Sequence, residues 1–362
     1  FAVLLGVRIA GGITSAVAQL HEGTVHLAAG DLETRIEVPN EDEFGDLADS
    51  FNEMTAAVKR GRDEAIERER LERELQTARE IQERLLPHAM PDLPGYEITG
   101  TSVPSLQVGG DYFDFLELGD GRLGVAIADV SGKGIPAALL MANLQALLQG
   151  QVIHPSDVAG IVARINDLLS RSTDASRGVG IGRFATFFYG VLERETGAFT
   201  FTNAGHNPPL LRRADGTLIE LKTGGLILGM MSGMPYAQET VTLEPGDVVV
   251  LFTDGITEAQ GPVPAMAAAA KAPGAAGKAA TATAAGGDGA DDDGEDEDDE
   301  EADDFDEPVN LFGDDKLRDI LAATGGRSAA EIRAAILEAV REHVAEIPPS
   351  DDITLVVLKR HS

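Results

Sequence analysis

Apolar residues follow two different spacings along the chain. In residues 13–27 and 44–58 they recur every three or four positions, which predicts two amphipathic helices with narrow apolar stripes. From residue 96 onward, short β-branched runs alternate with polar residues and end near glycines, which predicts strands joined by tight turns. We therefore expect a helical N-terminal part followed by a strand-rich domain.

The two N-terminal stripes are too thin to cover a globular core and are typical of coiled-coil seams. Gly30-Asp-Leu32 interrupts the first helix, and residues 36–39 suit an extended connector. Because neither helix can bury its stripe alone, we expect a parallel homodimer. The stripe positions are Ile13, Val17, Leu20, Thr24 and Leu27, then Phe44, Leu47, Phe51, Met54 and Val58.

Residues 62–86 alternate acidic and basic side chains densely, which gives many i,i+4 pairs and predicts a charged linker helix. Pro87, Pro91 and Pro94 end that helix. A coiled coil and a solvated spacer helix both fit this segment.

Strands that suit hairpins, with helices in blocks between them, indicate an α+β fold with antiparallel sheets. Helices are expected at residues 135–149, 156–169 and 328–346, the second with Ser156 as its N-cap. Strands are expected at 96–103, 112–118, 122–128, 184–193, 198–203, 208–213, 217–221, 239–243, 247–253 and 353–359.

Composition excludes several classes of function. The chain of 362 residues contains no cysteine, which removes disulfides, thiolate zinc sites and a cysteine nucleophile. Residues 288–307 hold 15 acidic residues of a chain whose net charge is −32, and the remainder is acidic too, so we expect no nucleic-acid binding. Residues 262–308, rich in Ala and Gly and then acidic, are expected to be a disordered insertion because they cannot bury enough apolar surface.

The chain begins at Phe1 with a short apolar run that ends before Arg8. Crossing a bilayer takes about 20 apolar residues, so this run is too short to do so. We expect the chain to be a fragment that starts at the cytoplasmic end of a transmembrane helix, with residues 1–12 as the remnant.

Four aspartates stand at the ends of apolar runs: Asp111, Asp129, Asp254 and Asp351. Carboxylates gathered within about 4 Å repel one another by roughly 4 kcal/mol per pair at an effective dielectric near 20, so cations must hold them together. Oxygen ligands favour Mg²⁺ or Mn²⁺, and several acids suit a two-metal hydrolytic site. An Asp-Gly pair after a strand is otherwise simply a turn.

Five motifs in a fixed order carry a resemblance to a known family. They are Gly109-Gly-Asp-Tyr-Phe-Asp114, Asp129-Val-Ser-Gly-Lys-Gly-Ile-Pro136, Asn203-Ala-Gly-His-Asn-Pro-Pro209, Phe252-Thr-Asp-Gly-Ile-Thr-Glu258 and Asp351-Asp-Ile-Thr354. Together they closely resemble the SpoIIE-type bacterial branch of the PPM metal-dependent serine/threonine phosphatases. In the N-terminal part, Asp42-Glu-Phe-Gly45 and Phe51-Asn-Glu-Met54 resemble the second helix of a HAMP signal-relay domain, although a plain helical hairpin also fits.

The resemblance implies two packed antiparallel sheets with helices on both outer faces, and two Mn²⁺ or Mg²⁺ ions. By motif, Asp129 would bridge the ions, with the Val130 carbonyl as a further ligand. Asp254 and Asp351 would complete one side and Asp111 the other.

The chain departs from the eukaryotic branch of the family in two respects, a missing histidine and a missing arginine. Ser131 stands where that branch carries a histidine proposed as general acid, and His206 is an alternative proton donor or else a turn histidine. Asp352 is either a further ligand or an acid at a strand start that faces solvent. No arginine matches the phosphate clamp of the eukaryotic branch.

We therefore expect a signalling protein with four parts: a membrane remnant (1–12), a HAMP-like domain (13–60), a linker (61–87) and a phosphatase domain (88–362). The resemblance implies a bacterial inner-membrane sensor with a cytoplasmic catalytic domain that dephosphorylates an anti-sigma-factor antagonist or similar regulator. The alternatives are a catalytically silent binding scaffold and a cyclase. Tyr112 stands where the cyclase signature needs an acid, and Gly132-Lys-Gly134 lacks the other residues of a nucleotide P-loop.

Overall fold

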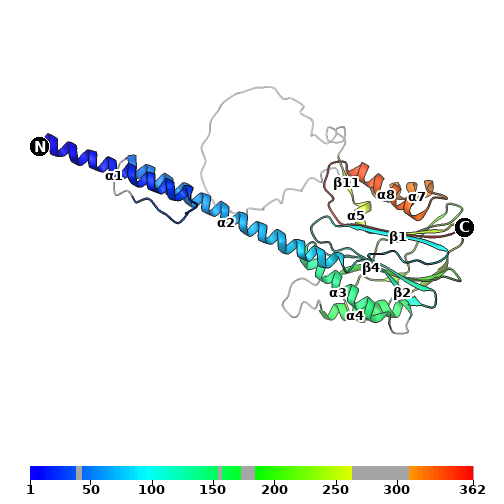
Figure 1. Ribbon diagram of the computed structural model, residues 1–362. Coiled ribbons are helices and arrows are strands. Elements are labelled where there is room, and N and C mark those ends of the chain that lie inside the picture. Colours follow the sequence, from blue (N-terminus) through cyan, green and yellow to red (C-terminus); the bar gives the residue numbers. More distant parts are fainter. Residues whose placement is uncertain (38–42, 154–156, 173–183, 263–309, 362) are drawn as a thin grey trace, which may run out of the picture. The chain divides into compact units, whose positions relative to one another are not determined.

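The computed structural model describes residues 1–37, 43–153, 157–172, 184–262 and 310–361 (Figure 1). It forms two compact units, Phe1–Ala78 and Arg79–Ser362. α2 runs without a break from Glu43 to Glu83, and the boundary between the units lies within it. None of the described helices combines the length and apolar character that a membrane span needs.

The first unit consists of α1 (Ala2–Ala28), an extended connector and the N-terminal part of α2. The Asn52 side chain fixes the connector, because it accepts a hydrogen bond from the Ile36 backbone N–H and donates one to its carbonyl, both at 2.9 Å. Ile36 is buried close to Gly23, where any larger residue would collide with it. The expected seam residues Val17, Leu47 and others remain about half exposed in the single chain.

Among its described residues, the second unit contains two large sheets and one two-stranded sheet. One has the order β1-β13-β10-β6-β7, all antiparallel, with β1 at Tyr96–Val103, β13 at Ile353–Arg360, β10 at Val248–Phe252, β6 at Leu210–Arg212 and β7 at Leu218–Glu220. The first and last strands of this unit, β1 and β13, therefore pair along their full length.

The other sheet is built on the antiparallel order β2-β3-β4-β5, and two short strands add to β5. The bounds are Tyr112–Gly119 for β2, Arg122–Val130 for β3, Ala185–Glu193 for β4, Ala198–Ala204 for β5, Gly224–Gly225 for β8 and Glu239–Thr242 for β9. β8 pairs in parallel with β5, and β9 pairs antiparallel.

Helices cover the outer face of each sheet (Figure 1). α3 (Ile135–Gln151) and α4 (Val158–Ser172) pack on the β2-β3-β4-β5 sheet, and α7 (Gly313–Ala323) and α8 (Ala329–Val344) pack on the other. A third apolar cluster, rich in phenylalanine, joins the facing sides of the two sheets. The expected α+β architecture of two packed antiparallel sheets flanked by helices is confirmed.

The expected strands all form, whereas several short elements were not predicted. These are α5 (Asp254–Thr257), α7, β8, β11 (Gln260–Gly261) and β12 (Asn310–Leu311). β11 and β12 pair with each other, so the chain on either side of residues 263–309 is joined by backbone hydrogen bonds. Almost all of the expected disordered insertion, and the expected N-cap Ser156, lie outside the described residues.

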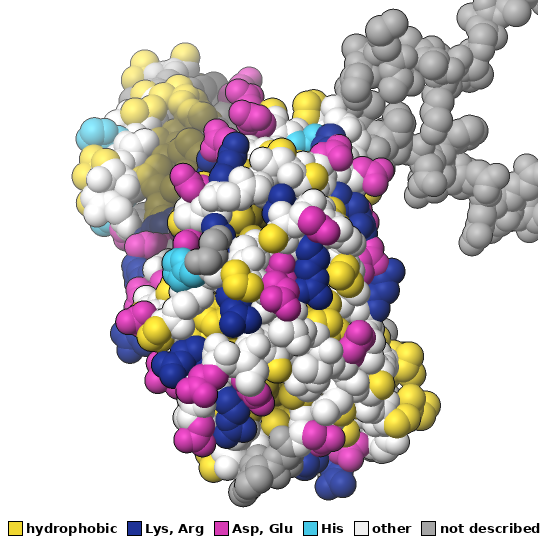
Figure 2. Space-filling model, turned by 90° about the vertical axis from the view of Figure 1, so that its right-hand side faces the viewer, with side chains coloured by type: hydrophobic (Ala, Val, Ile, Leu, Met, Phe, Trp, Pro, Cys, Tyr) yellow, Lys and Arg dark blue, Asp and Glu magenta, His cyan; other side chains and the backbone are white. Residues whose placement is uncertain are grey.

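On the face shown in Figure 2, lysine and arginine side chains are interspersed with aspartate and glutamate. The described residues of this face form no continuous basic patch of the kind that nucleic-acid binding uses.

Candidate metal and phosphate site

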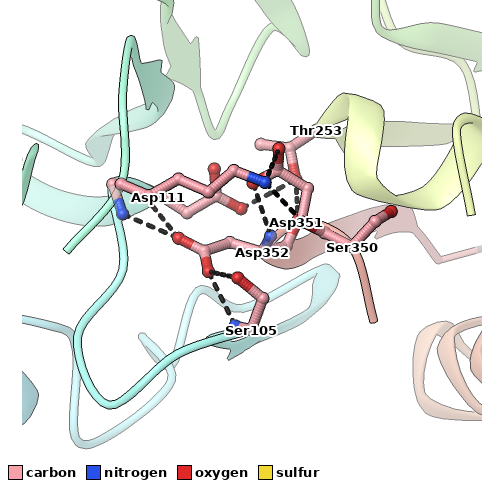
Figure 3. Close-up of polar contacts among 8 residues, drawn as sticks. Ser105, Asp111, Thr253, Ser350, Asp351 and Asp352 are labelled. Carbon is pink, nitrogen blue, oxygen red and sulfur yellow. Dashed lines mark hydrogen bonds and ion pairs between the residues drawn. The ribbon is translucent and has the colours of Figure 1, made fainter. Parts of the chain in front are cut away.

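Four separate chain segments meet at one edge of the two sheets. Asp129 ends β3, Asp254 begins α5 directly after β10, Asp351 precedes β13, and Asp111 precedes β2. Figure 3 shows Asp111, Asp351 and Asp352 close together although they come from opposite ends of the second unit. The structure therefore gathers the four aspartates singled out by their motifs.

Asp111 is buried, and Thr253 holds it in place. The Thr253 hydroxyl donates to Oδ2 of Asp111 at 2.8 Å and accepts from the Thr354 backbone N–H at 3.0 Å. One hydroxyl thus connects the loop before β2 with the ends of β10 and β13. Gly110 allows a further close approach, because a Cβ atom there would lie 2.8 Å from the Val130 carbonyl oxygen.

Asp352 is buried, with 6% of its surface exposed, so it does not face solvent. Its Oδ1 accepts from the backbone N–H and hydroxyl of Ser105, at 2.7 and 2.9 Å. Its Oδ2 accepts from the Gly110 N–H at 2.7 Å and more weakly from the Asp111 N–H at 3.4 Å. Both carboxylate oxygens therefore hold the loop that carries Asp111 (Figure 3).

The position of Asp254 depends on Gly255, the glycine that follows it. A Cβ atom at Gly255 would overlap the Asp352 carbonyl oxygen, so the Asp-Gly pair lets α5 start directly against β13. The Asp351 side chain is 43% exposed. Its Oδ1 accepts from the Asp352 N–H at 2.9 Å, and its Oδ2 lies 3.1 Å from Nζ of Lys133.

Burial, together with neighbouring carboxylates, raises the pKa of Asp111, Asp129 and Asp254. Burial raises the pKa of Asp129 to about 7, with Asp254, Asp351 and Asp352 adding to the shift. Burial also raises the pKa of Asp111 well above its usual value, and the pKa of Asp254 is raised by burial and then by Glu258 and Asp351. The carboxylates of the four motifs therefore interact electrostatically, and their negative charge is poorly compensated.

A set of oxygen donors with excess negative charge suits hard divalent cations. Among the described residues, no three His, Asp or Glu side chains already lie at ion-holding distances from a common point. Oδ2 of Asp351 is paired with the ammonium group of Lys133. The residues fit a divalent metal site by their chemistry, and ion binding would draw the carboxylates closer together.

His206 and Ser131 are both engaged within the protein. The His206 side chain is buried, with 3% of the residue exposed, and its Nδ1 lies 2.8 Å from the Thr186 hydroxyl oxygen. Burial lowers the pKa of His206 to about 3, so the ring is neutral at physiological pH. The Ser131 hydroxyl oxygen accepts from the Phe184 N–H at 3.0 Å, which leaves its own hydrogen available to donate.

Sequence reasoning missed the residues that position the acids: Ser105, Thr186 and Thr253, together with Lys133 and Gln82. The Gln82 side chain, in the last turn of α2, donates to the Gly109 carbonyl at 2.6 Å and accepts from the Gly109 N–H at 3.0 Å. Thr253 was detectable as a polar residue between an apolar strand and Asp254, whereas the other contacts bring together distant segments without a local signal.

Comparisons with known proteins identify the family. The family described as Stage II sporulation protein E (SpoIIE) matches residues 119–299, and the HAMP domain family matches residues 8–60. The chain belongs to the SpoIIE family and carries an N-terminal HAMP domain. Both recognitions made from the sequence are confirmed.

Among curated relatives, the phosphoserine phosphatase RsbU of Bacillus subtilis is 36% identical over 189 residues, covering 51% of this chain and 53% of RsbU. Protein IcfG of Synechocystis sp. is 30% identical over 274 residues, covering 69% of this chain and 43% of IcfG. The chain thus spans about half the length of these relatives.

Solved structures share the fold. The SiaA-PP2C domain of Pseudomonas aeruginosa matches with a TM-score of 0.59 and 20% identity, over 82% of this chain and 99% of that domain. The RsbU and RsbW domains of Rv1364c from Mycobacterium tuberculosis match with a TM-score of 0.52 and 26% identity, over 76% of this chain and 63% of that one. The second unit therefore has a PP2C-like fold.

Proposed function

We propose that this chain is a metal-dependent protein serine/threonine phosphatase whose activity is controlled through its HAMP domain. The observation that carries the proposal is the meeting of Asp111, Asp129, Asp254 and Asp351 at one sheet edge, where burial and neighbouring carboxylates raise the pKa of the first three. The relative named phosphoserine phosphatase RsbU supports the same activity.

The metal site would hold two Mn²⁺ or Mg²⁺ ions. Asp129 would contact both ions, with the Val130 carbonyl as a further ligand, while Asp254 and Asp351 would contribute on one side and Asp111 on the other. When bound, such ions supply an activated water and neutralise charge on the phosphate. We assign Asp352 to holding the Asp111 loop, since its oxygens are already occupied by Ser105 and Gly110.

The leaving serine or threonine oxygen needs a hydrogen-bond donor as its bond to phosphorus breaks. Ser131 has a hydroxyl hydrogen available and stands two residues after Asp129. His206 is buried and neutral, so we assign it a positioning role instead of proton donation.

Control by the HAMP domain would pass along α2. In the second unit, the last turn of α2 holds the loop that carries Asp111 through the two hydrogen bonds between Gln82 and Gly109. A rotation of α2 would move Gly109 and with it Asp111. We further propose a parallel homodimer formed through the half-exposed stripe of the first unit, and attachment to the bacterial inner membrane with the catalytic domain in the cytoplasm.

The substrate class we propose is a phosphorylated regulatory protein, such as an anti-sigma-factor antagonist. The test compares wild type with Asp129→Ala and Asp254→Ala for Mn²⁺-dependent phosphate release from a phosphoserine protein. Both variants should lose activity while far-UV circular dichroism stays unchanged, and Asp319→Asn, exposed on α7, should behave as wild type. Full turnover in both alanine variants would rule out the proposal.

A silent scaffold with the same fold would show no phosphate release from the wild-type protein on any phosphoprotein tested. Calorimetric titration with Mn²⁺ separates the two cases, because a functional site should bind ions with an affinity that Asp129→Ala removes.

A further inference from the structure

Lys133 is presented to the acidic site by a fixed turn. Gly132 and Gly134 on either side have φ angles of +94° and +72°, which residues with a Cβ atom rarely adopt. Gly134 is also the N-cap of α3, and its carbonyl accepts from the Ala137 and Ala138 N–H groups at 3.1 Å. The Gly-Lys-Gly sequence therefore places Lys133 between the end of β3 and the start of α3.

The Lys133 ammonium group lies at the solvent side of the carboxylates. Its Nζ is 3.1 Å from Oδ2 of Asp351 and donates to the Ser350 carbonyl, while half of its side-chain surface stays exposed. Its positive charge also lowers the pKa of both Asp129 and Asp254. The positive charge of Lys133 thus acts on Asp129, Asp254 and Asp351, and it remains accessible to solvent.

Binding of divalent ions would change this arrangement. Asp351 would then direct its oxygens to an ion, and the ammonium group would lose its partner next to the position where a phosphate must enter. A phosphate monoester carries up to two negative charges, and a lysine on a flexible stem offers three donors to it. No arginine of this chain matches the phosphate clamp of the eukaryotic branch, so Lys133 would supply the positive charge that such an arginine provides.

We propose that Lys133 binds the phosphoryl group of the substrate, with Nζ donating to a phosphoryl oxygen that the metal ions do not hold. The inference rests on the proposed phosphatase function and adds a residue that contacts the substrate. A lysine that only balances the charge of Asp351 would change ion affinity and leave phosphate affinity unaltered.

The test uses the full chain in Mn²⁺ with Lys133→Met and Lys133→Arg, and with Lys222→Ala as matched control. Lys222 is likewise an exposed lysine paired with a carboxylate, Glu220. A lost charge-assisted hydrogen bond should weaken binding of inorganic phosphate by about 10- to 100-fold in Lys133→Met, measured by calorimetry, and raise KM for a phosphoserine protein similarly. Lys133→Arg should recover part of the affinity, and Lys222→Ala should match wild type.

Phosphate affinity and KM that stay unchanged in Lys133→Met would overturn the proposal, and so would a change confined to Mn²⁺ affinity. Failure of the phosphatase assignment is distinguishable, because wild-type protein would then release no phosphate at all. Weaker phosphate binding by Lys133→Met in the calorimeter would still support the lysine as an anion-binding residue, since that readout needs no turnover.

Discussion

Nδ1 of His206 and the hydroxyl oxygen of Thr186 are 2.8 Å apart, and they connect a turn after β5 with the strand beside Asp129. The Thr186 hydroxyl also lies 3.4 Å from the Asp129 carbonyl, and Thr186 is paired with Asp129 across the sheet. The Asn203 side chain fixes the backbone of His206 through hydrogen bonds at 2.7 and 3.0 Å. The histidine motif therefore supports the position of Asp129 from inside the protein.

His206 is expected to stay neutral across the working pH range. Its folded pKa of about 3 lies below the ordinary value of 6.5, so the unfolded chain binds the extra proton first. The stability that this residue contributes is present above pH 6.5 and falls as the pH drops from 6.5 towards 3, by several kcal/mol in total. Nitrogen NMR of the imidazole should show a neutral ring from pH 8 to pH 5. A titration near pH 6.5 would contradict the buried position.

In metal-free protein, the pKa shift of Asp129 is expected to change stability with pH in the opposite direction from that of His206. Its folded pKa of about 7 exceeds the ordinary 3.8, so the folded state keeps its proton longer than the unfolded chain. Stability should fall as the pH rises from about 4 to about 7, by roughly 2–4 kcal/mol after allowance for partial exposure. Urea denaturation in a chelator should show this loss in wild type and a smaller one in Asp129→Asn, with Mn²⁺ reversing the loss only in wild type.

Asp351 and Asp352, although adjacent, are expected to respond differently to substitution. Asp352→Ala leaves the buried N–H of Gly110 without its acceptor and frees the loop, which should cost about 2–4 kcal/mol of unfolding free energy. Asp351→Ala removes a half-exposed carboxylate and should change stability by less than about 1 kcal/mol while weakening Mn²⁺ binding. Urea denaturation and calorimetry on both variants decide the matter. Equal stability losses would show that Asp352 is no loop anchor.

Gly255→Ala is expected to damage the site although it removes no ligand. The added Cβ atom overlaps the Asp352 carbonyl, so the backbone must shift and carry Asp254 with it, at a cost of about 2 kcal/mol or more. Gly150→Ala is the control, because this residue lies in α3 with open space around a Cβ atom and should be neutral or slightly stabilising. Thermal denaturation and Mn²⁺ titration measure both effects.

The apolar stripe of the first unit is expected to mediate self-association. Leu47 and Met54 are about half exposed at seam positions of α2, so Leu47→Asp should place a charge in the interface of a dimer. Sedimentation should show a shift towards monomer in this variant, whereas Glu69→Gln, exposed further along α2, should leave the wild-type distribution unchanged. A wild-type protein that is monomeric at micromolar concentration would contradict the parallel homodimer.

The sequence predicted the sheets well because their strands carry a local signal. β13 contains the apolar run Leu355–Leu358, and the bounds of β1 and β13 were predicted to within one residue. α7 was missed because it is short, begins with Gly-Asp-Asp and follows the acidic segment, so its apolar face rests on only a few residues.

The sequence predicted which acids belong to the candidate site, but it did not predict how buried they are or which residues they contact. Asp111, Asp129, Asp254 and Asp351 each end or begin an apolar run, which is visible in the sequence. The burial of Asp352 and His206 depends on loops that return from distant parts of the chain, and no local pattern encodes it. Lys133 was considered only as part of a nucleotide loop, because its place beside Asp351 arises from tertiary structure.

The ladder of β11 and β12 has a consequence for how this family varies in length. Gln260 faces Leu311 and Gly261 faces Asn310, so the two described segments that flank residues 263–309 in the sequence are hydrogen-bonded to each other. A turn of about two to five residues would be long enough to close this hairpin. Evolution could therefore lengthen, shorten or exchange this stretch without disturbing the register of a single catalytic strand.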